Sequence, residues 1–168
     1  MLVFTAEEAW VSRFGEGASV HLQDFPEAPA RWRDTELATK WADLRDIRRA
    51  VTGCLERARA DGTIGASLQA APVLHLPEAA AGLLSAAEWA ELAIVSRLSL
   101  ATTPPPEGAF AHPDRPDVAV AFARAEGEKC ARCWRVLPEV GSAFAHPALC
   151  RRCADAVESG LVCKAAAA

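Results

Sequence analysis

The sequence contains no run of about 18 or more apolar residues, so no segment is long enough to span a membrane as a helix. It also lacks a secretory signal, because Glu7 and Glu8 stand where such a signal carries Lys or Arg followed by a long apolar stretch. We therefore expect a cytoplasmic protein. The balance of 51% hydrophobic and 24% charged residues is that of a globular chain, which excludes disordered and collagen-like classes.

The 168 residues are enough for one ordinary domain or for a few small pieces of a larger protein. The net charge of −4 is unevenly distributed. Residues 1–30 and 62–128 are acidic, whereas residues 31–61 and 129–168 are basic. Such alternation is expected where only parts of a surface meet a polyanion, although short charged runs are usually just solvated faces.

The clearest periodic segment predicts one long amphipathic helix over residues 35–60, ended by the turn signal Asp61-Gly62. Apolar residues recur at spacings of three and four and form one stripe, consisting of Leu37, Trp41, Leu44, Ile47, Val51, Leu55 and Ala58. Cys54 is placed off this stripe. The arginines and Lys40 occupy other faces, where they are either solvated charges paired with neighbours such as Glu56 or contacts for phosphate groups.

A shorter helix is expected before it, because Thr5 and Glu8 have the spacing of a capping box. Gly15 and Gly17 would end this helix. Residues 20–25 and the prolines that follow predict an extended connection. A lone capped helix has little of its own to pack on, which suggests a truncated bundle.

Between the long helix and the cysteine-rich end, the pattern predicts a small β-α-β-β unit. Strands are expected over residues 67–76, with Pro72 at an edge or bulge, and over 93–100 and 118–123. The Ala-, Leu- and Glu-rich residues 79–92 predict the helix. A unit of this size buries little core alone, so we expect it to pack on the long helix.

Four of the six cysteines form two Cys-x2-Cys pairs, Cys130/Cys133 and Cys150/Cys153, separated by 16 residues. Each pair can direct two thiolates inward from one tight turn. A hairpin within the intervening residues would bring the pairs together, so that four sulfurs surround a zinc ion at about 2.3 Å. Four protein ligands leave no open position for substrate or water. The spacing therefore predicts one structural Zn²⁺ and no catalytic metal.

Other uses of these cysteines have weaker support. A redox pair would need one Cys-x-x-Cys at a helix N-terminus in a thioredoxin-like unit. An iron–sulfur cluster or a rubredoxin-like iron site fits the four thiolates as well. His146 could compete as a ligand, although the set is complete without it. Cys54 and Cys163 are interpreted as incidental thiols.

Basic residues gather around the cysteines, with Glu139 as the single acid between positions 129 and 152; they are Lys129, Arg132, Arg135, Arg151 and Arg152. Trp134 directly follows the second cysteine. An aromatic ring beside arginines on a rigid knuckle offers a face for stacking an unpaired base and cations for phosphates. Trp134 can equally serve as an apolar lid over the zinc site, and the two roles can coexist.

The finger sequence Glu128-Lys-Cys-Ala-Arg-Cys-Trp134, followed by Cys150-Arg-Arg-Cys153, resembles the C-terminal zinc finger of bacterial isoleucyl-tRNA synthetases. The upstream segments Phe4-Thr-Ala-Glu-Glu-Ala-Trp10, Leu55-Glu-Arg-Ala-Arg59 and Ile64-Gly-Ala-Ser-Leu68 resemble the end of that family's helical anticodon-binding domain and the junction module after it. The finger motif alone is shared with formamidopyrimidine-type DNA glycosylases. The upstream match separates the two families.

This resemblance implies an α+β fold in three parts. Residues 1–62 would be the end of a helical anticodon-binding domain, residues 63–125 a small α+β junction module with a mixed sheet, and residues 126–160 a four-cysteine zinc finger of the ribbon or knuckle type. Residues 161–168 would be a disordered tail. The zinc ligands would be Cys130, Cys133, Cys150 and Cys153, and the RNA-contacting residues would be Arg132 and Trp134.

The function implied is binding of the anticodon region of the isoleucine tRNA, within a monomeric class I synthetase that attaches isoleucine using ATP. The chain has no Rossmann unit, no HIGH-type or KMSKS-type signature and no editing domain, so we expect it to hold no catalytic residue and to be inactive alone. ATP and Mg²⁺ would bind in the domains that it lacks. The alternative is a free-standing zinc-ribbon module that binds nucleic acid, with a finger of the DNA-glycosylase type.

Overall fold

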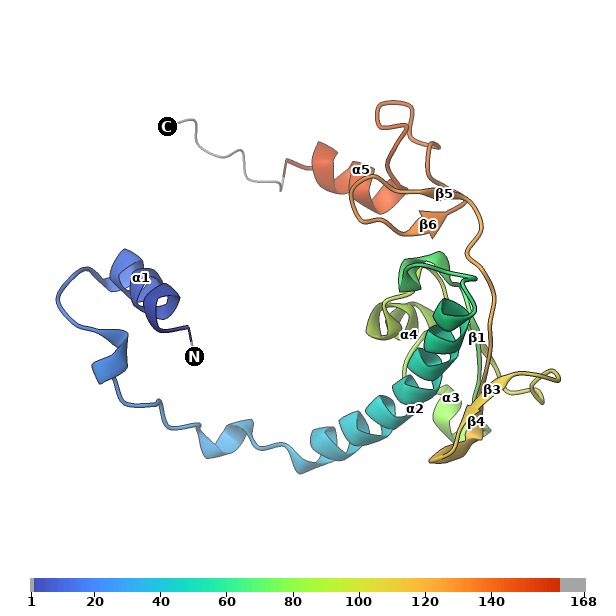
Figure 1. Ribbon diagram of the computed structural model, residues 1–168, viewed down its shortest axis with the longest axis horizontal. Coiled ribbons are helices and arrows are strands. Elements are labelled where there is room, and N and C mark those ends of the chain that lie inside the picture. Colours follow the sequence, from blue (N-terminus) through green and yellow to red (C-terminus); the bar gives the residue numbers. More distant parts are fainter. Residues whose placement is uncertain (1, 161–168) are drawn as a thin grey trace. The chain divides into compact units, whose positions relative to one another are not determined.

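The computed structural model describes residues 2–160, and its internal contacts divide the chain into two compact units, residues 1–38 and residues 39–168. The expected tail at 161–168, which includes Cys163, lies outside the described residues. Helices and short sheets alternate along the chain, which confirms the α+β class (Figure 1). In the described part of the chain, no helix has both the length and the apolar character needed to cross a bilayer.

The first unit contains helix α1 (Val3–Phe14) and the 3₁₀ turns Val20–Leu22 and Ala30–Trp32. The helix begins at Val3 rather than at Thr5, and Leu2 holds the N-cap position without a side-chain hydrogen bond, so the predicted capping box was wrong. Glu7 has another role on this helix. Its carboxylate accepts hydrogen bonds from Ser19 Oγ at 2.9 Å and from Val20 N–H at 3.0 Å, which ties the first 3₁₀ turn to α1.

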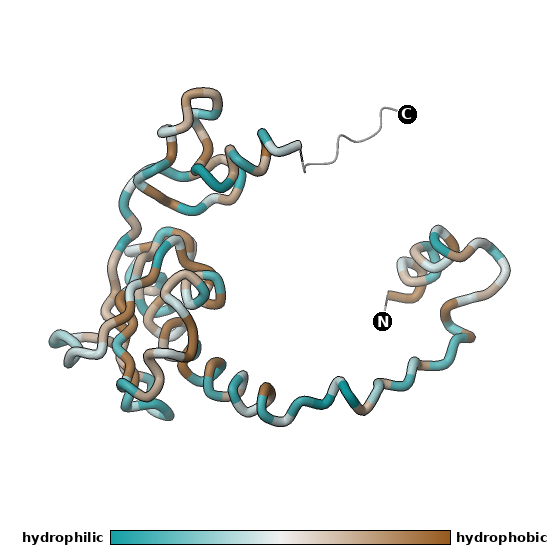
Figure 2. The backbone as a smooth tube through the Cα atoms, turned by 180° about the vertical axis from the view of Figure 1, so that it is seen from behind, coloured by the Kyte–Doolittle hydropathy of each residue, from teal (hydrophilic) through white to brown (hydrophobic). Residues whose placement is uncertain are grey.

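Helix α2 spans Thr35–Ala60, the bounds that the sequence predicts. Hydrophilic and hydrophobic stretches alternate along it, as Figure 2 shows in teal and brown. Burial begins only at Leu44, because Leu37 and Trp41 are 48% and 41% exposed. Cys54 is 4% exposed and belongs to the core, so its placement off the apolar stripe was wrong. The buried arc of the helix is broader than a single row of residues at three- and four-residue spacing.

A four-stranded mixed sheet shares one hydrophobic core with α2. Its strands lie in the order β2-β1-β4-β3, and they are β1 (Val73–His75), β2 (Ser99–Ala101), β3 (Phe110–His112) and β4 (Arg115–Ala121). Strands β1 and β2 are parallel, while β4 is antiparallel to both of its neighbours. Leu74 of β1 pairs with Val120 of β4, and both side chains are fully buried with Ile47 of α2. The expected packing of the small module on the long helix is confirmed.

Strands β1 and β2 are shorter than the sequence predicts. Strand β1 occupies three residues of the expected span 67–76, because Ser67–Gln69 forms a 3₁₀ turn. Pro72 precedes β1 in the interior of the sheet rather than at an edge, and its carbonyl accepts the Ser99 N–H at 3.1 Å. The prediction of a strand over residues 93–100 is also wrong for most of that range, since β2 begins only at Ser99.

The expected helix over residues 79–92 is divided in two, α3 (Glu78–Ala81) and α4 (Ala86–Ala93). Ser85 and Glu88 form a reciprocal capping box that starts α4. Ile94 ends it in the left-handed region, with φ 57°. This turn redirects the chain before β2 and explains why residues 94–98 are not part of a strand.

Strand β3, which the sequence pattern did not predict, packs across α2. A Cβ atom on Gly53 of α2 would lie 2.6 Å from the Phe110 ring of β3, closer than any real contact. The missing side chain of Gly53 therefore makes room for Phe110. This contact explains a glycine inside a helix, where glycine ordinarily costs about 1 kcal/mol relative to alanine.

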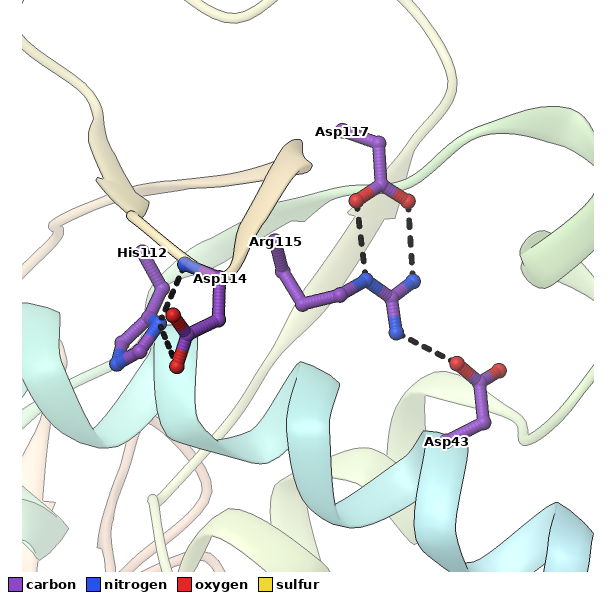
Figure 3. A network of polar contacts seen from close by, with 5 residues as sticks. All are labelled: Asp43, His112, Asp114, Arg115 and Asp117. Carbon is purple, nitrogen blue, oxygen red and sulfur yellow. Dashed lines mark hydrogen bonds and ion pairs between the residues drawn. The ribbon is translucent and has the colours of Figure 1, made fainter.

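Arg115, at the start of β4, links the β3–β4 hairpin to α2 (Figure 3). Its guanidinium donates to both carboxylate oxygens of Asp117, at 2.9 and 3.0 Å, and to Asp43 of α2 at 2.5 Å. The Arg115 side chain is 18% exposed, so the pairs are partly shielded from water. The hydrogen bonds from Arg115 lower the pKa of Asp117 below its ordinary value.

The C-terminal part of the described chain forms the finger. It consists of a short hairpin, β5 (Glu128–Lys129) with β6 (Val136–Leu137), and the helix α5 (Arg151–Glu158). The hairpin encloses the first cysteine pair, so the expectation of a hairpin between the two pairs was wrong. Gly127 has φ 103°, and a Cβ there would lie 2.3 Å from the Leu137 backbone. Only glycine allows the chain to enter the hairpin at this point.

Candidate metal centre and nucleic-acid interface

The sulfur atoms of the four predicted ligands lie within 4.8 Å of one another. Cys130 and Cys133 come from the turn inside the hairpin, and Cys150 and Cys153 from the start of α5. The Cys133 and Cys150 sulfurs are 3.8 Å apart. Sulfurs bound at about 2.3 Å to one tetrahedral zinc are separated by about 3.8 Å. The cluster therefore fits one structural zinc, and its closed set of four ligands leaves no site for substrate.

Backbone N–H groups prepare the sulfurs for metal. The Cys150 N–H points at Cys130 Sγ at 3.3 Å. Burial raises the pKa of the Cys130 thiol, but backbone hydrogen bonds from Cys133, Cys150 and Arg132 outweigh it and lower the pKa to about 6. The lowered pKa favours the thiolate form of Cys130, which is the form that binds metals. Burial and neighbouring thiols raise the pKa of Cys150 to about 12, so zinc binding there displaces a proton.

Two arginines of the finger face the sulfurs. Arg132 Nη1 donates to Cys153 Sγ at 3.7 Å. Burial alone would lower the pKa of Arg152, but a hydrogen bond to Cys133 and the charge of the nearby thiolates raise it. Four thiolates around one Zn²⁺ carry a net charge of −2. Arg132 and Arg152 offset this charge at the sulfurs themselves.

The Trp134 side chain is largely exposed to solvent. It is 61% exposed and lies outside the residues that form the finger's core, which does not support a role as an apolar lid. The Lys129 ammonium lies 5.2 Å from its ring centroid, a cation–π contact. Its backbone is in the left-handed region, with φ 66°, while its N–H donates to the Cys130 carbonyl at 2.9 Å. The knuckle therefore fixes the backbone from which the indole projects.

Ser96 joins the finger to the α+β module, a connection that the sequence does not reveal. The residue is fully buried, and its hydroxyl donates to the Leu68 carbonyl at 2.5 Å and accepts the Val136 N–H at 2.7 Å. Its carbonyl accepts two hydrogen bonds from the Arg135 guanidinium, from Nε at 3.0 Å and from Nη2. The two finger partners, Arg135 and Val136, are about forty positions from Ser96, and no local pattern signals pairing over such a separation.

The other candidate ligands lie away from the metal cluster. His146 Nε2 is 3.5 Å from a Glu158 carboxylate oxygen, and the cluster is complete without it. Cys54 belongs to the larger core, where its thiol points at the Val120 carbonyl at 3.8 Å and burial raises its pKa. Neither residue takes part in the site.

Two family models match the chain. Residues 127–156 match the zinc finger found in FPG and IleRS, and residues 1–74 match the anticodon-binding domain of tRNA ligase. These two matches place an anticodon-binding domain of tRNA ligases ahead of a zinc finger in one chain, and the four-cysteine cluster lies within the matched finger.

The chain corresponds to the C-terminal region of the isoleucine–tRNA ligase family. It is 52% identical over 159 residues to the isoleucine–tRNA ligase of Gluconobacter oxydans, which covers 95% of this chain and 16% of the relative. The enzymes of Ruegeria pomeroyi and Brucella abortus are 48% and 45% identical, over 91% and 94% of the chain. The chain spans 16% of the length of each of these relatives.

Proposed function

We propose that this chain binds the anticodon region of the isoleucine tRNA, as the C-terminal part of a monomeric, cytoplasmic isoleucyl-tRNA synthetase. That enzyme attaches isoleucine to its tRNA, with ATP and Mg²⁺ bound in domains outside this chain. Residues 1–62 would be the end of the anticodon-binding domain, residues 63–125 the junction module and residues 126–160 the finger. The matches to isoleucine–tRNA ligases and to an anticodon-binding domain support this function.

Trp134 is the observation that carries the proposal. An exposed indole in a left-handed backbone costs stability, since a non-glycine residue there is strained by about 1–3 kcal/mol. A stacked base recovers a similar amount, about 1–3 kcal/mol by alanine substitution. The adjoining ligand Cys133 and the hydrogen bond to the Cys130 carbonyl hold the backbone of Trp134, so less ordering is needed when a base stacks on its ring.

Arg132 is the second proposed contact. It lies between two zinc ligands in the sequence, and its Nη1 donates a hydrogen bond to Cys153 Sγ. A guanidinium has five N–H donors, so the others remain available for a base edge or a phosphate. A base-edge contact would contribute discrimination, and a phosphate contact would contribute salt-dependent affinity.

The second candidate function is a free-standing zinc-ribbon module that binds duplex DNA. One observation favours it: the finger model describes a motif that tRNA ligases share with FPG proteins. The match of residues 1–74 to an anticodon-binding domain supports the RNA function instead.

The test compares Trp134→Ala with Phe144→Ala. Phe144 is the control because it is also aromatic and is fully exposed in the same finger. We expect Trp134→Ala to weaken binding of the isoleucine tRNA about tenfold, equivalent to about 1.4 kcal/mol, with one zinc per chain retained. Phe144→Ala should bind as the unsubstituted chain does. Unchanged tRNA affinity in a zinc-loaded Trp134→Ala chain would refute the stacking role, and a preference for duplex DNA over tRNA would favour the second candidate.

A further inference from the structure

A cleft of about 570 Å³ lies where the finger meets the α+β module, and three of the seven residues that line it are arginines. Arg97 comes from the module, and Arg135 and Arg151 come from the finger. Glu139 is the acidic residue among those that line it. We call this feature the arginine cleft.

The positive charge of the arginine cleft is not neutralised by ion pairs within the described chain. Across residues 2–160, no ion pair joins a carboxylate to Arg97, Arg135 or Arg151. The zinc thiolates have Arg132 and Arg152 beside them instead. With Glu139 counted, the lining keeps an excess of two positive charges directed at solvent.

The hydrogen bonds that join Ser96 to Arg135 and Val136, here called the Ser96 joint, hold the walls of the cleft together. Arg97 directly follows Ser96, and Arg135 is bonded to the Ser96 carbonyl through Nε and Nη2. This leaves Nη1 of Arg135 as the nitrogen free for a ligand. Arg151 is restrained more weakly, by a contact of 3.4 Å from its Nε to Ser142 Oγ. Because Arg135, and more weakly Arg151, are ordered beforehand, binding an anion there requires less loss of side-chain freedom.

We infer that the arginine cleft binds backbone phosphates of the same RNA whose base stacks on Trp134. This inference rests on the proposed function. Arg135 directly follows Trp134, and the Cα atoms of adjacent residues are about 3.8 Å apart, less than the span of one nucleotide. A nucleotide stacked on Trp134 is therefore close enough for its flanking phosphates to reach a residue that lines the cleft. Guanidinium forks match phosphate oxygens in geometry as well as in charge.

The experiment measures tRNA binding by the whole 168-residue chain over a series of salt concentrations. The variants Arg97→Gln and Arg151→Gln each remove one cation of the cleft. Arg124→Gln is the matched control, because Arg124 is an exposed module arginine whose Nη1 contacts the Thr63 carbonyl, away from the cleft. Zinc content and circular dichroism check that each variant is folded.

We expect both cleft variants to weaken tRNA binding several-fold at low salt. Each should also reduce the slope of log affinity against log salt by about 0.7–0.9 for every phosphate that is no longer neutralised. Arg124→Gln should leave the slope unchanged. Ethylation of certain tRNA phosphates should weaken binding of the unsubstituted chain. At the phosphates that Arg97 contacts, the same ethylation should have no effect on binding of Arg97→Gln.

Two outcomes separate the failure of this inference from that of the proposed function. If Trp134→Ala weakens tRNA binding while both cleft variants keep the affinity and salt slope of the Arg124→Gln control, the arginine cleft does not contact RNA and the proposed function stands. If the unsubstituted chain does not bind tRNA at all, both are overturned. Loss of poly-glutamate binding in the cleft variants, with tRNA binding intact, would overturn the inference in favour of an acidic protein partner.

Discussion

Trp134 combines two properties that folding alone does not favour. Its backbone is left-handed, and its large apolar ring is mostly in water. The first follows from the knuckle, since the Trp134 N–H must turn back to the Cys130 carbonyl. Glycine would meet that requirement without strain. The proposed stacking of an RNA base on the ring would account for a tryptophan at this position.

Replacing Trp134 by glycine should consequently stabilise the finger while weakening RNA binding. Relief of the left-handed backbone should increase the stability of the zinc-loaded finger by about 1 kcal/mol relative to Trp134→Ala, which keeps the strained Cβ. Both variants remove the indole that lies against Lys129, so their tRNA affinities should fall equally. Thermal unfolding and tRNA titration of the two variants measure this. Equal stability of Trp134→Gly and Trp134→Ala would mean that the backbone at this position is not strained.

At the scale of elements, the predictions succeeded where the signal is long and failed where it is short. Helix α2 spans about seven turns, and its periodicity predicted both of its ends. Strand β3 has three residues, too few for an alternation to stand out, and it was missed. Strand β1 was placed correctly, although its length was overestimated.

The zinc ligands could be predicted from the sequence and the connection through Ser96 could not, because only the first has a local signal. Zinc-ligand spacing is local and depends on two tight turns, so the four ligands could be predicted from the sequence. Ser96 acts through partners about forty residues away, and a serine inside a hydrophobic segment gives no sign of them. The wide buried arc of α2, which includes Cys54, depends on covering elements that periodicity alone does not specify.

The link between α2 and the β3–β4 hairpin should depend on pH through Arg115. Arg115→Met keeps the apolar stem and removes the guanidinium, and it should cost about 1 kcal/mol at pH 7, because Asp43 and Asp117 are 43% and 46% exposed and regain water. Arg115 lowers the pKa of Asp117 below the unfolded value of about 3.9. Its stabilising effect is thus complete above that value and is lost as the pH falls through the lower folded pKa.

Hydrogen exchange of the β4 amides, compared between Arg115→Met and the unsubstituted chain at pH 7 and pH 3, measures this effect. The stability difference should be full at pH 7 and smaller at pH 3. Arg49→Met serves as the control, since its partner Asp46 forms an exposed pair within one helix. A difference for Arg115→Met that is the same at both pH values would show that packing, not charge, links the hairpin to α2.

At the scale of the whole molecule, residues 39–160 contain two cores of very different composition. The larger core joins α2 to the four-stranded sheet and α4, and it buries large side chains such as Trp89, Ile47 and Leu74. The finger's core consists of its four cysteines with Leu137, Val140 and Leu149. So few apolar side chains cannot offset the entropy lost when a segment of this size folds. The metal must supply that free energy.

Removal of zinc should therefore unfold the finger and leave the larger core folded. With a chelator at neutral pH, we expect the chain to release one zinc and the amides of residues 128–158 to exchange at nearly unfolded rates, while those of β1 and β4 stay protected. Cys150→Ser should reproduce this state without a chelator. Cys54→Ala, which changes a cysteine of the larger core, should keep the zinc and the protection of the finger.

Because the Ser96 carbonyl loses its Arg135 partner when the finger unfolds, exchange near residue 96 should rise as well, which would show that the joint depends on the folded finger. Protection of residues 128–158 that survives complete removal of zinc would mean that the finger's own core suffices to fold it.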